Sequence, residues 1–175
     1  TFGEAGFTLA KPTSDSRAAI TLSSSNAAVA TVDGTSGAVT IVGAGTTTFT
    51  ASQAANDDFF AASKAMTFTV RQATPTLGVM TGATKTFGDS SFSLTKPSSP
   101  SSGAFSFSSS NAGVASVDGE GKVSVVGAGT ATITATQAAS GNYTSSSAAA
   151  VVTVGRATTT IANLALNNLT YGASD

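Results

Sequence analysis

The chain of 175 residues is 41% hydrophobic but only 10% charged, with a formal net charge of −1. This balance provides no basic surface for nucleic acid and no run of like charges for a membrane surface. The absence of cysteine and histidine excludes disulfides, thiolate metal sites and Ser/His or Cys/His nucleophiles. No apolar stretch approaches the roughly 18–20 residues of a spanning helix, so no membrane insertion is predicted for this segment.

The residue types present favour strands and turns over helices. Serine supplies 26 residues and threonine 29, whereas glutamate, lysine and glutamine supply only two, five and three. Threonine, valine, isoleucine and phenylalanine favour strands, and serine, glycine, asparagine and aspartate favour turns. Composition therefore predicts an all-β fold.

One long stretch occurs twice in the chain. Residues 23–45 read SSSNAAVATVDGTSGAVTIVGAG, and residues 108–129 read SSSNAGVASVDGEGKVSVVGAG. The offset is 85 residues at Asp33 and Asp118, and it falls to 84 after that turn because the first copy carries one extra residue. The chain is therefore predicted to contain tandem copies of one unit and to begin inside a repeat of a longer protein.

The core of the first copy can be predicted by comparing the two copies. The apolar positions that match along both copies are expected to point inward. In the first copy they are Phe7, Leu9, Ile20, Leu22, Val29, Val32, Val39, Ile41, Phe49, Met66, Phe68 and Val70.

Alternating polarity and turn signals predict seven short strands in the second copy. In chain order they are Thr76–Met80, Phe92–Leu94, Phe105–Ser108, Val114–Val117, Val123–Val125, Thr130–Thr136 and Ala150–Val154. The sixth strand alternates threonine with Ala131, Ile133 and Ala135, which predicts a hydroxyl face and an apolar face. Both Phe105 and Phe107 are expected to be buried, and Ile161–Leu164 is the counterpart of the first strand in a third copy.

The repeated run carries a family resemblance. The pattern SSSN-x-x-VA-x-VD, followed by G-x-V-x-x-VGAGT-x-x-x-TA, is similar to the bacterial Ig-like domain of the group 2 type, and it covers both copies and nearly the whole chain. Such domains occur in tandem in large bacterial surface proteins, including intimin- and invasin-like adhesins. The resemblance implies tandem Ig-like antiparallel β-sandwiches without catalytic residues. Unlike antibody domains, the chain has no cysteine pair and no tryptophan, so its core must rest on other apolar residues.

The resemblance also sets domain boundaries. Thr1-Phe2-Gly3 matches Thr86-Phe87-Gly88, and in such a fold the first strand precedes this tripeptide. Residues 1–71 are thus predicted to be an Ig-like repeat without its first strand and residues 72–155 a complete repeat. Residues 156–175 are predicted to be the first strand and the start of a third. The linkers are only a few residues long, so the repeats are expected to form a fairly stiff, rod-like array.

The carboxylates offer two kinds of candidate site, neither of which is assigned. Asp57-Asp58 is the closest approach of two acidic residues to a catalytic pair, but it lies in a loop. Calcium is the alternative cofactor, because aspartate and asparagine oxygens in loops suit it. Glu4 matches Asp89, and Asp33 matches Asp118 in an Asp-Gly turn that needs no metal. No catalytic, cofactor-binding or metal-binding residue is predicted.

Three further patterns have structural explanations. Lys11 and Lys96, with Asn26 and Asn111, are the residue types of a self-formed Lys–Asn crosslink, but both lysines precede proline and should be solvated. Gly-Ala-Gly at residues 43–45 and 127–129 lacks the Lys-Ser/Thr of a phosphate loop and predicts a tight turn. Asn142-Tyr143-Thr144 and Asn168-Leu169-Thr170 fit the glycosylation pattern, which is common by chance in a threonine-rich chain.

The leading functional hypothesis is a non-enzymatic structural or spacer repeat of a large bacterial cell-surface or secreted protein. It would form an adhesin stalk or an extracellular filament, with neighbouring Ig-like repeats of the same or adjacent chains as its partners. In a variant of this hypothesis, residues 157–169 fill the gap in residues 1–70 of another molecule by strand addition, which would generate fibres.

The alternative hypothesis is an adhesive module that binds host glycoprotein, glycan or matrix through its end loops. The most divergent loops are Ser14–Ala18 against Ser98–Gly103, and Asn56–Phe60 against Ser140–Thr144. Phe59-Phe60 and Tyr143 are either exposed aromatic contacts or caps of the core.

Overall fold

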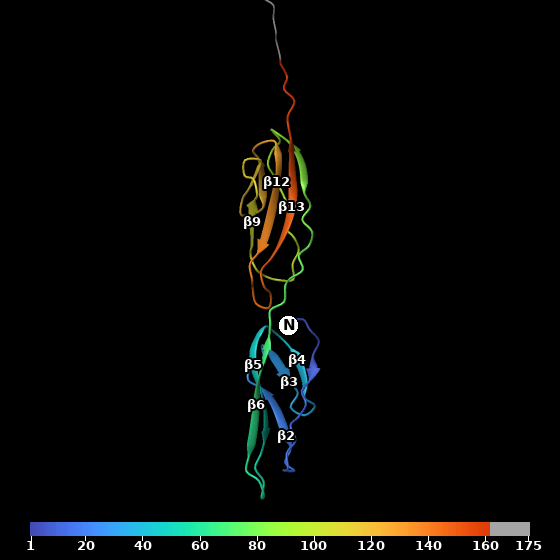
Figure 1. Ribbon diagram of the computed structural model, residues 1–175, viewed down its shortest axis with the longest axis vertical. Coiled ribbons are helices and arrows are strands. Elements are labelled where there is room, and N and C mark those ends of the chain that lie inside the picture. Colours follow the sequence, from blue (N-terminus) through green and yellow to red (C-terminus); the bar gives the residue numbers. More distant parts are fainter. Residues whose placement is uncertain (162–175) are drawn as a thin grey trace, which may run out of the picture.

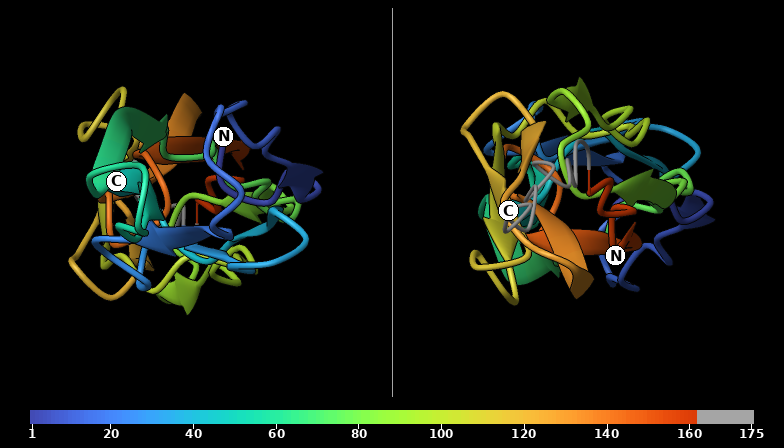
Figure 2. Two further views of the ribbon diagram at one scale, coloured as in Figure 1. Left: turned by 90° about the horizontal axis from the view of Figure 1, so that it is seen from below. Right: turned by 90° about the horizontal axis from the view of Figure 1, so that it is seen from above.

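In the computed structural model, which describes residues 1–161, the chain forms thirteen β-strands and no helix over these residues (Figure 1). Strands β1–β6 make an N-terminal unit and β7–β13 make a C-terminal unit. Figure 1 shows the units one after the other along the longest axis, and the views along that axis superpose them (Figure 2). Over residues 1–161 there is consequently no helix that could cross a membrane.

The N-terminal unit consists of two three-stranded sheets. Their strand orders are β1-β4-β3 and β2-β5-β6, and all pairs are antiparallel. The strands are β1 (Phe7–Thr8), β2 (Ile20–Ser24), β3 (Ala30–Val32), β4 (Ala38–Ile41), β5 (Gly45–Gln53) and β6 (Ala62–Val70).

The C-terminal unit repeats this plan with one additional strand. Its sheets have the orders β10-β11-β8 and β7-β13-β12-β9. The strands are β7 (Ala83–Thr86), β8 (Phe92–Ser93), β9 (Phe105–Ser109), β10 (Ala115–Val117), β11 (Lys122–Val125), β12 (Gly129–Gln137) and β13 (Ser146–Gly155). The additional strand β7 pairs with β13 in parallel, whereas the other strand pairs are antiparallel.

The core of the C-terminal unit follows from the alternation along β12. Ala131, Ile133 and Ala135 are at most 2% exposed, while the threonines between them lie on the opposite face. Val152 and Val154 of the neighbouring β13 are buried in the same cluster. The predicted hydroxyl face and apolar face are therefore confirmed.

Six of the seven strands predicted for this unit are present, with ends that differ by at most four residues. The prediction of a first strand at Thr76–Met80 is wrong. That segment buries Met80 but makes one backbone hydrogen bond to its neighbour, from the Gly78 N–H to the Ser98 carbonyl (2.9 Å), and hence no ladder. The first strand lies later, at β7, because only there does the chain run along β13.

Two burial predictions are also wrong. Phe105 and Phe107 are half-buried because they lie on β9, the edge strand of the four-stranded sheet. In the N-terminal unit Phe7 is 39% exposed and Met66 49% exposed. No described segment covers that side of the N-terminal core.

The division at residues 71/72 and 155/156 stays a prediction, and the Ile161–Leu164 strand lies mostly outside the described residues.

The fully buried Ile133 tests this account of the core. We expect Ile133→Ala to lower the free energy of unfolding by about 2–5 kcal/mol, because it removes packed methyl groups and leaves a cavity. The matched control is Val151→Ala, since Val151 is 54% exposed on the outer face of β13 and should cost about 0.5 kcal/mol or less. Urea unfolding measures both, and equal losses would contradict the assignment of the inner face.

Candidate functional site

The junction between the two units contains specific side-chain contacts outside the cores. The Asn142 side chain, from the loop before β13, accepts a hydrogen bond through Oδ1 from the Ala44 N–H of the N-terminal unit (2.7 Å). Beside it, Tyr143 meets Phe2 edge to face, with ring centroids 5.5 Å apart. One polar and one aromatic contact therefore join the loop of the C-terminal unit to the N-terminal unit.

The linker is fixed to both units by its backbone. Ala73 donates to the Asn142 carbonyl and accepts from the Thr144 N–H, both at 2.9 Å. On the other side, the Phe2 N–H donates to the Arg71 carbonyl (2.9 Å). Gln72 adds a side-chain hydrogen bond from Nε2 to the Gly141 carbonyl (2.8 Å). The predicted short linker is thus held by hydrogen bonds on both sides.

A tight turn presents Asn142 and Tyr143 to the junction. Ser140 and Tyr143 exchange two backbone hydrogen bonds of 3.0 Å. Gly141 inside the turn has a φ of +54°, which glycine adopts without strain. The glycosylation pattern at Asn142 therefore lies at a half-buried contact, and the pattern at Asn168 is outside the described residues.

The equivalent loop of the N-terminal unit has no such partner among the described residues. Asn56 Oδ1 accepts hydrogen bonds from the backbone of Asp58 and Phe59 (3.1 and 2.9 Å). Phe59 is 44% exposed and Phe60 is 97% exposed. Of the aromatic residues predicted as contacts or caps, Tyr143 thus packs at the junction, while the two phenylalanines face solvent.

Buried glutamines, which the sequence analysis missed, fix the other pair of divergent loops. Gln137 is 1% exposed and donates through Nε2 to the carbonyls of Ser101 and Gly103 (both 2.9 Å), while Ser99 Oγ donates to its Oε1. Gln53 holds the Ser14–Ala18 loop in the same way. Both copies have a glutamine at the end of the long strand, and this match could have predicted the shared role of Gln53 and Gln137. The two loops differ in sequence, but a buried glutamine at the equivalent position holds each of them.

The Asp-Gly turns are held by their own carboxylates. Asp33 Oδ1 accepts hydrogen bonds from the Ser36 N–H (2.6 Å), the Ser36 hydroxyl (2.8 Å) and the Thr35 N–H (3.1 Å). These bonds, led by the Ser36 N–H, hold the pKa of Asp33 below its usual value. Asp118 accepts from the N–H groups of Glu120 and Lys122 in the same way. The structural explanation of this turn is supported.

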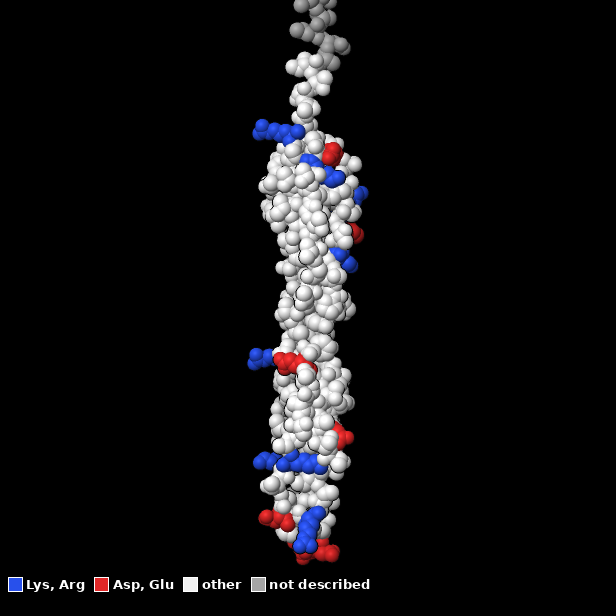
Figure 3. Space-filling view, turned by 90° about the vertical axis from the view of Figure 1, so that its right-hand side faces the viewer, with Lys and Arg blue, Asp and Glu red and all other residues white. Residues whose placement is uncertain are grey.

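The other acidic candidates remain separate. Glu4 Oε2 contacts the Thr1 amine (2.7 Å), and Asp89 Oδ2 accepts from the Thr86 N–H (2.8 Å). No three acidic side chains converge within residues 1–161. Acidic and basic groups are interspersed on the face in Figure 3, without a continuous basic stretch.

The residues considered for a crosslink make other contacts. Lys11 Nζ donates to the Ile20 carbonyl (3.1 Å), and Lys96 Nζ lies 5.4 Å from the Phe105 ring centroid. Both lysines are exposed, as expected. Asn26 and Asn111 each accept, through Oδ1, a backbone N–H two residues ahead (3.1 Å).

The Gly-Ala-Gly segments are tight turns, as predicted. Gly129 begins β12 with a φ of +143°, and a Cβ there would lie 2.8 Å from Val114 Cγ2. Gly45 has the same geometry against Val29. Glycine is therefore required where the chain leaves each turn.

A comparison with sequence families finds a match for both copies of the repeat. The family described as "Intimin, immunoglobulin-like domain" matches residues 6–55 and 94–139, which cover the corresponding parts of both copies. This match agrees with the resemblance to bacterial Ig-like domains found in the sequence. No curated protein matches the chain.

Solved structures show distant likeness. Domains 1–6 of the surface layer protein SbsC are 22% identical, with a TM-score of 0.35 over 82% of this chain and 21% of that chain. Human protocadherin-24 EC1-2 is 12% identical, with a TM-score of 0.36 over 79% of this chain and 82% of that one. A SusE-like surface located polysaccharide binding protein from the Bacteroides thetaiotaomicron heparin utilisation locus is 13% identical (TM-score 0.33; 78% and 24%). The chain thus spans about a fifth of the surface layer structure, and at these TM-scores the likeness adds nothing about function.

The junction can be tested by the variant Asn142→Ala together with Tyr143→Ala. We expect the two units to stay folded but to vary more in relative orientation, because the contacts with Ala44 and Phe2 are lost. Small-angle scattering and residual dipolar couplings in dilute solution measure this change. The matched control is Asp58→Ala with Phe59→Ala, at the equivalent loop that contacts no other unit in the described residues. Equal effects of the two double variants would contradict the role of the junction.

Proposed function

The chain belongs to the intimin immunoglobulin-like domain family, and we propose from this premise that it is a non-enzymatic spacer module of a bacterial surface or secreted protein. It holds successive Ig-like units in line and so projects other parts of the protein away from the cell. The single observation that carries the proposal is the junction, where the linker and the Asn142 loop connect two units by specific contacts.

The energetics of the junction support a spacer. A flexible linker leaves neighbouring domains free to reorient, and domain motion is the default unless contacts oppose it. Here Ala73 pairs with the turn of its own unit, and the Asn142 and Tyr143 side chains of that turn contact the preceding unit. Each net hydrogen bond contributes about 0.5–1.5 kcal/mol, and the aromatic pair adds about as much. Together these contacts favour one orientation of the units over many.

The residue inventory also supports a mechanical role. The chain has neither histidine nor cysteine, and the acidic side chains of residues 1–161 do not converge. The Asp33 and Asp118 carboxylates instead hold turns. Long antiparallel ladders such as β5–β6 and β12–β13, with nine residue pairs each, resist extension of the chain.

A chain in which residues 72–155 are duplicated in frame tests the spacer role. We expect the maximum dimension from small-angle scattering in dilute solution to grow by one constant increment per added copy. As a control, four glycines inserted between Arg71 and Gln72 should broaden the distribution of distances without unfolding the cores. A compact particle, or equal behaviour of both chains, would refute a stiff spacer.

Exposed aromatic residues favour a second candidate function, an adhesive module. Phe59 and Phe60 protrude from one end loop, with 44% and 97% exposure, and exposed aromatic side chains are frequent anchors of binding sites. Host glycoproteins, glycans and matrix proteins are the candidate ligands. An array of these ligands should bind the wild-type chain and not the Phe59→Ser/Phe60→Ser variant. Binding by neither chain removes this candidate and leaves the spacer role untouched.

A further inference from the structure

Strand β9 forms one edge of the four-stranded sheet, and among residues 1–161 it pairs only with β12. Just beyond its end, the Ser110 N–H donates to the Thr132 carbonyl at the start of β12 (2.9 Å). The direction of the backbone groups alternates along a strand, so Phe105 and Phe107 direct theirs away from β12. Such an edge can accept a further strand if its N–H and carbonyl groups are free.

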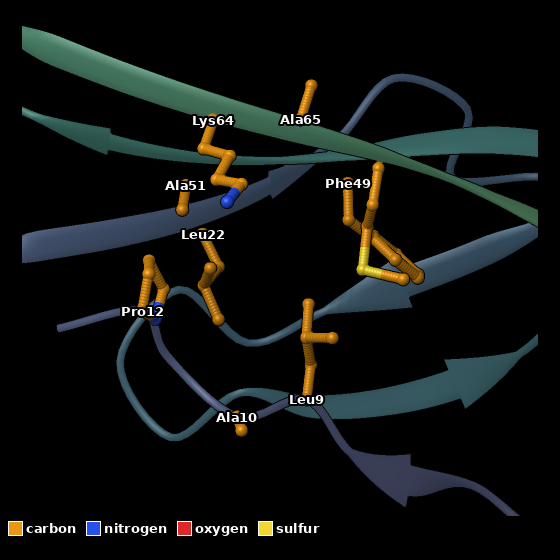
Figure 4. Close-up of a pocket in the computed structure, with 9 residues that line it drawn as sticks. Leu9, Ala10, Pro12, Leu22, Phe49, Ala51, Lys64 and Ala65 are labelled. Atoms are coloured by element: carbon orange, nitrogen blue, oxygen red, sulfur yellow. The ribbon is translucent and has the colours of Figure 1, made fainter.

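In the N-terminal unit, the chain itself occupies the equivalent edge, on β2. The Leu22 N–H donates to the Gly34 carbonyl of the Asp-Gly turn (3.2 Å), and Lys11 Nζ donates to the Ile20 carbonyl (3.1 Å). The Leu22 side chain points into an apolar groove beside the core, which it lines together with Leu9 (Figure 4). Its backbone therefore remains available for the contact with the turn.

The C-terminal unit leaves the same groups open. The equivalents of Leu22 and Ile20 are Phe107 and Phe105. Neither the Phe107 N–H nor the Phe105 carbonyl has a hydrogen-bond partner within residues 1–161. The lysine of this unit, Lys96, lies over the Phe105 ring, with Nζ 5.4 Å from the ring centroid, instead of donating to the strand.

The length of the Asp-Gly turn distinguishes the two edges. The turn of the N-terminal unit has one extra residue, and its Gly37 N–H donates to the carbonyl of Asp33, four residues earlier (2.9 Å). In the C-terminal unit the Gly121 N–H donates to the carbonyl of Asp118, only three residues earlier (3.2 Å). The turn beside β2 is thus the wider of the two.

The two turns also differ in how closely they approach the edge. A Cβ built on Gly34 would lie 3.2 Å from the Leu22 carbonyl oxygen. A Cβ built on Gly119, the equivalent glycine, would meet no other atom of the described residues within 4 Å. The wider turn therefore covers β2, and the shorter turn stays clear of β9.

The residues of β9 do not oppose a second strand. Its sequence, Phe-Ser-Phe-Ser-Ser, contains no charged residue and no proline, which are common means of preventing pairing at an edge. Ser106 and Ser108 are exposed on the outer face of the sheet, so two copies of this strand can lie side by side without like charges opposite each other. We propose that β9 pairs in antiparallel fashion with β9 of a second copy of this chain.

One register pairs all five residues of both strands. It places Phe107 opposite Phe107 of the second copy and Ser106 opposite Ser108 of the second copy. In this register the two Phe107 residues exchange N–H and carbonyl hydrogen bonds, because both direct these groups outward. A twofold axis relates the two copies, so the contact closes as a dimer and joins the two four-stranded sheets into one.

The inference goes beyond the spacer role, because it concerns sideways association of the chain through a strand in the middle of a unit. A contact along one strand edge is smaller than a standard stable interface, so the dimer should form only as concentration rises. The two copies of β9 run in opposite directions. In the proposed spacer, the pair therefore connects chains that project toward one another.

Charges at the two exposed serines of the full chain test the register by sedimentation equilibrium. The wild-type mass should rise from the monomer value of 17.0 kDa to twice that value as concentration increases. Ser106→Lys with Ser108→Lys sets lysines opposite each other and should stay monomeric over the same range. Ser106→Lys with Ser108→Asp sets lysine opposite aspartate at the same positions and should dimerise at least as strongly as the wild type.

Two further variants test the role of the turn. Replacing Glu120 by Thr-Ser gives the C-terminal unit the longer turn of the N-terminal unit, and it should cover β9 and abolish the dimer. The matched control is Thr21→Lys with Ser23→Lys, at the equivalent positions on the covered strand β2, which should dimerise as the wild type does. Circular dichroism confirms that each variant is folded.

A mixture of two monomeric variants gives the decisive result. The chain with lysine at both serine positions and the chain with aspartate at both should each stay monomeric alone and form a one-to-one dimer together. A wild-type chain that stays monomeric would overturn the proposal and leave a strand of another protein as the remaining occupant of the edge. Association that is unchanged by Ser106→Lys with Ser108→Lys would overturn it as well, because the contact would then lie elsewhere.

Discussion

The structure depends on the segment that leads into each Ig-like unit. In the C-terminal unit this segment places Met80 in the core and then, as β7, pairs with the edge of β13. Full burial of a methionine side chain stabilises a fold by about 1.5–3 kcal/mol, and the parallel pairing satisfies an edge that would otherwise be open. Where residues 1–161 supply no such segment, in the N-terminal unit, Met66 is half-exposed and a groove replaces closed core.

The same segment also forms the junction. Ala73, at its start, pairs with Tyr143, whose ring packs on Phe2 of the preceding unit. The core of one unit and its orientation on the preceding one therefore depend on a single stretch of chain. This coupling supports the proposed spacer role, because a unit cannot reorient freely on the preceding one unless the start of its own first segment also detaches.

Sequence patterns predicted most strands of the repeat. They did not predict how the segment that leads into a unit covers its core. Alternation along β12 and the Asp-Gly and Gly-Ala-Gly turns have local causes, so they could be read without a structure. Thr76–Met80 has the apolar residues of a strand, yet it buries Met80 in the core without forming a ladder of backbone hydrogen bonds. The alternation of polar and apolar residues cannot distinguish these two cases. Gln137 was recognisable from its match in Gln53. Asn142 was not, because its equivalent is Asp58 and its partner Ala44 is distant in sequence.

Amide hydrogen exchange of the two equivalent strands tests the central claim that the entering segment closes each unit. In dilute solution, the amides of β13 that face β7 should exchange slowly. The amides of β6 on the equivalent edge should exchange at least tenfold faster, although both strands have nine-residue ladders on their other side. Equal protection of the two edges would show that the N-terminal unit closes without an entering segment and would contradict the account.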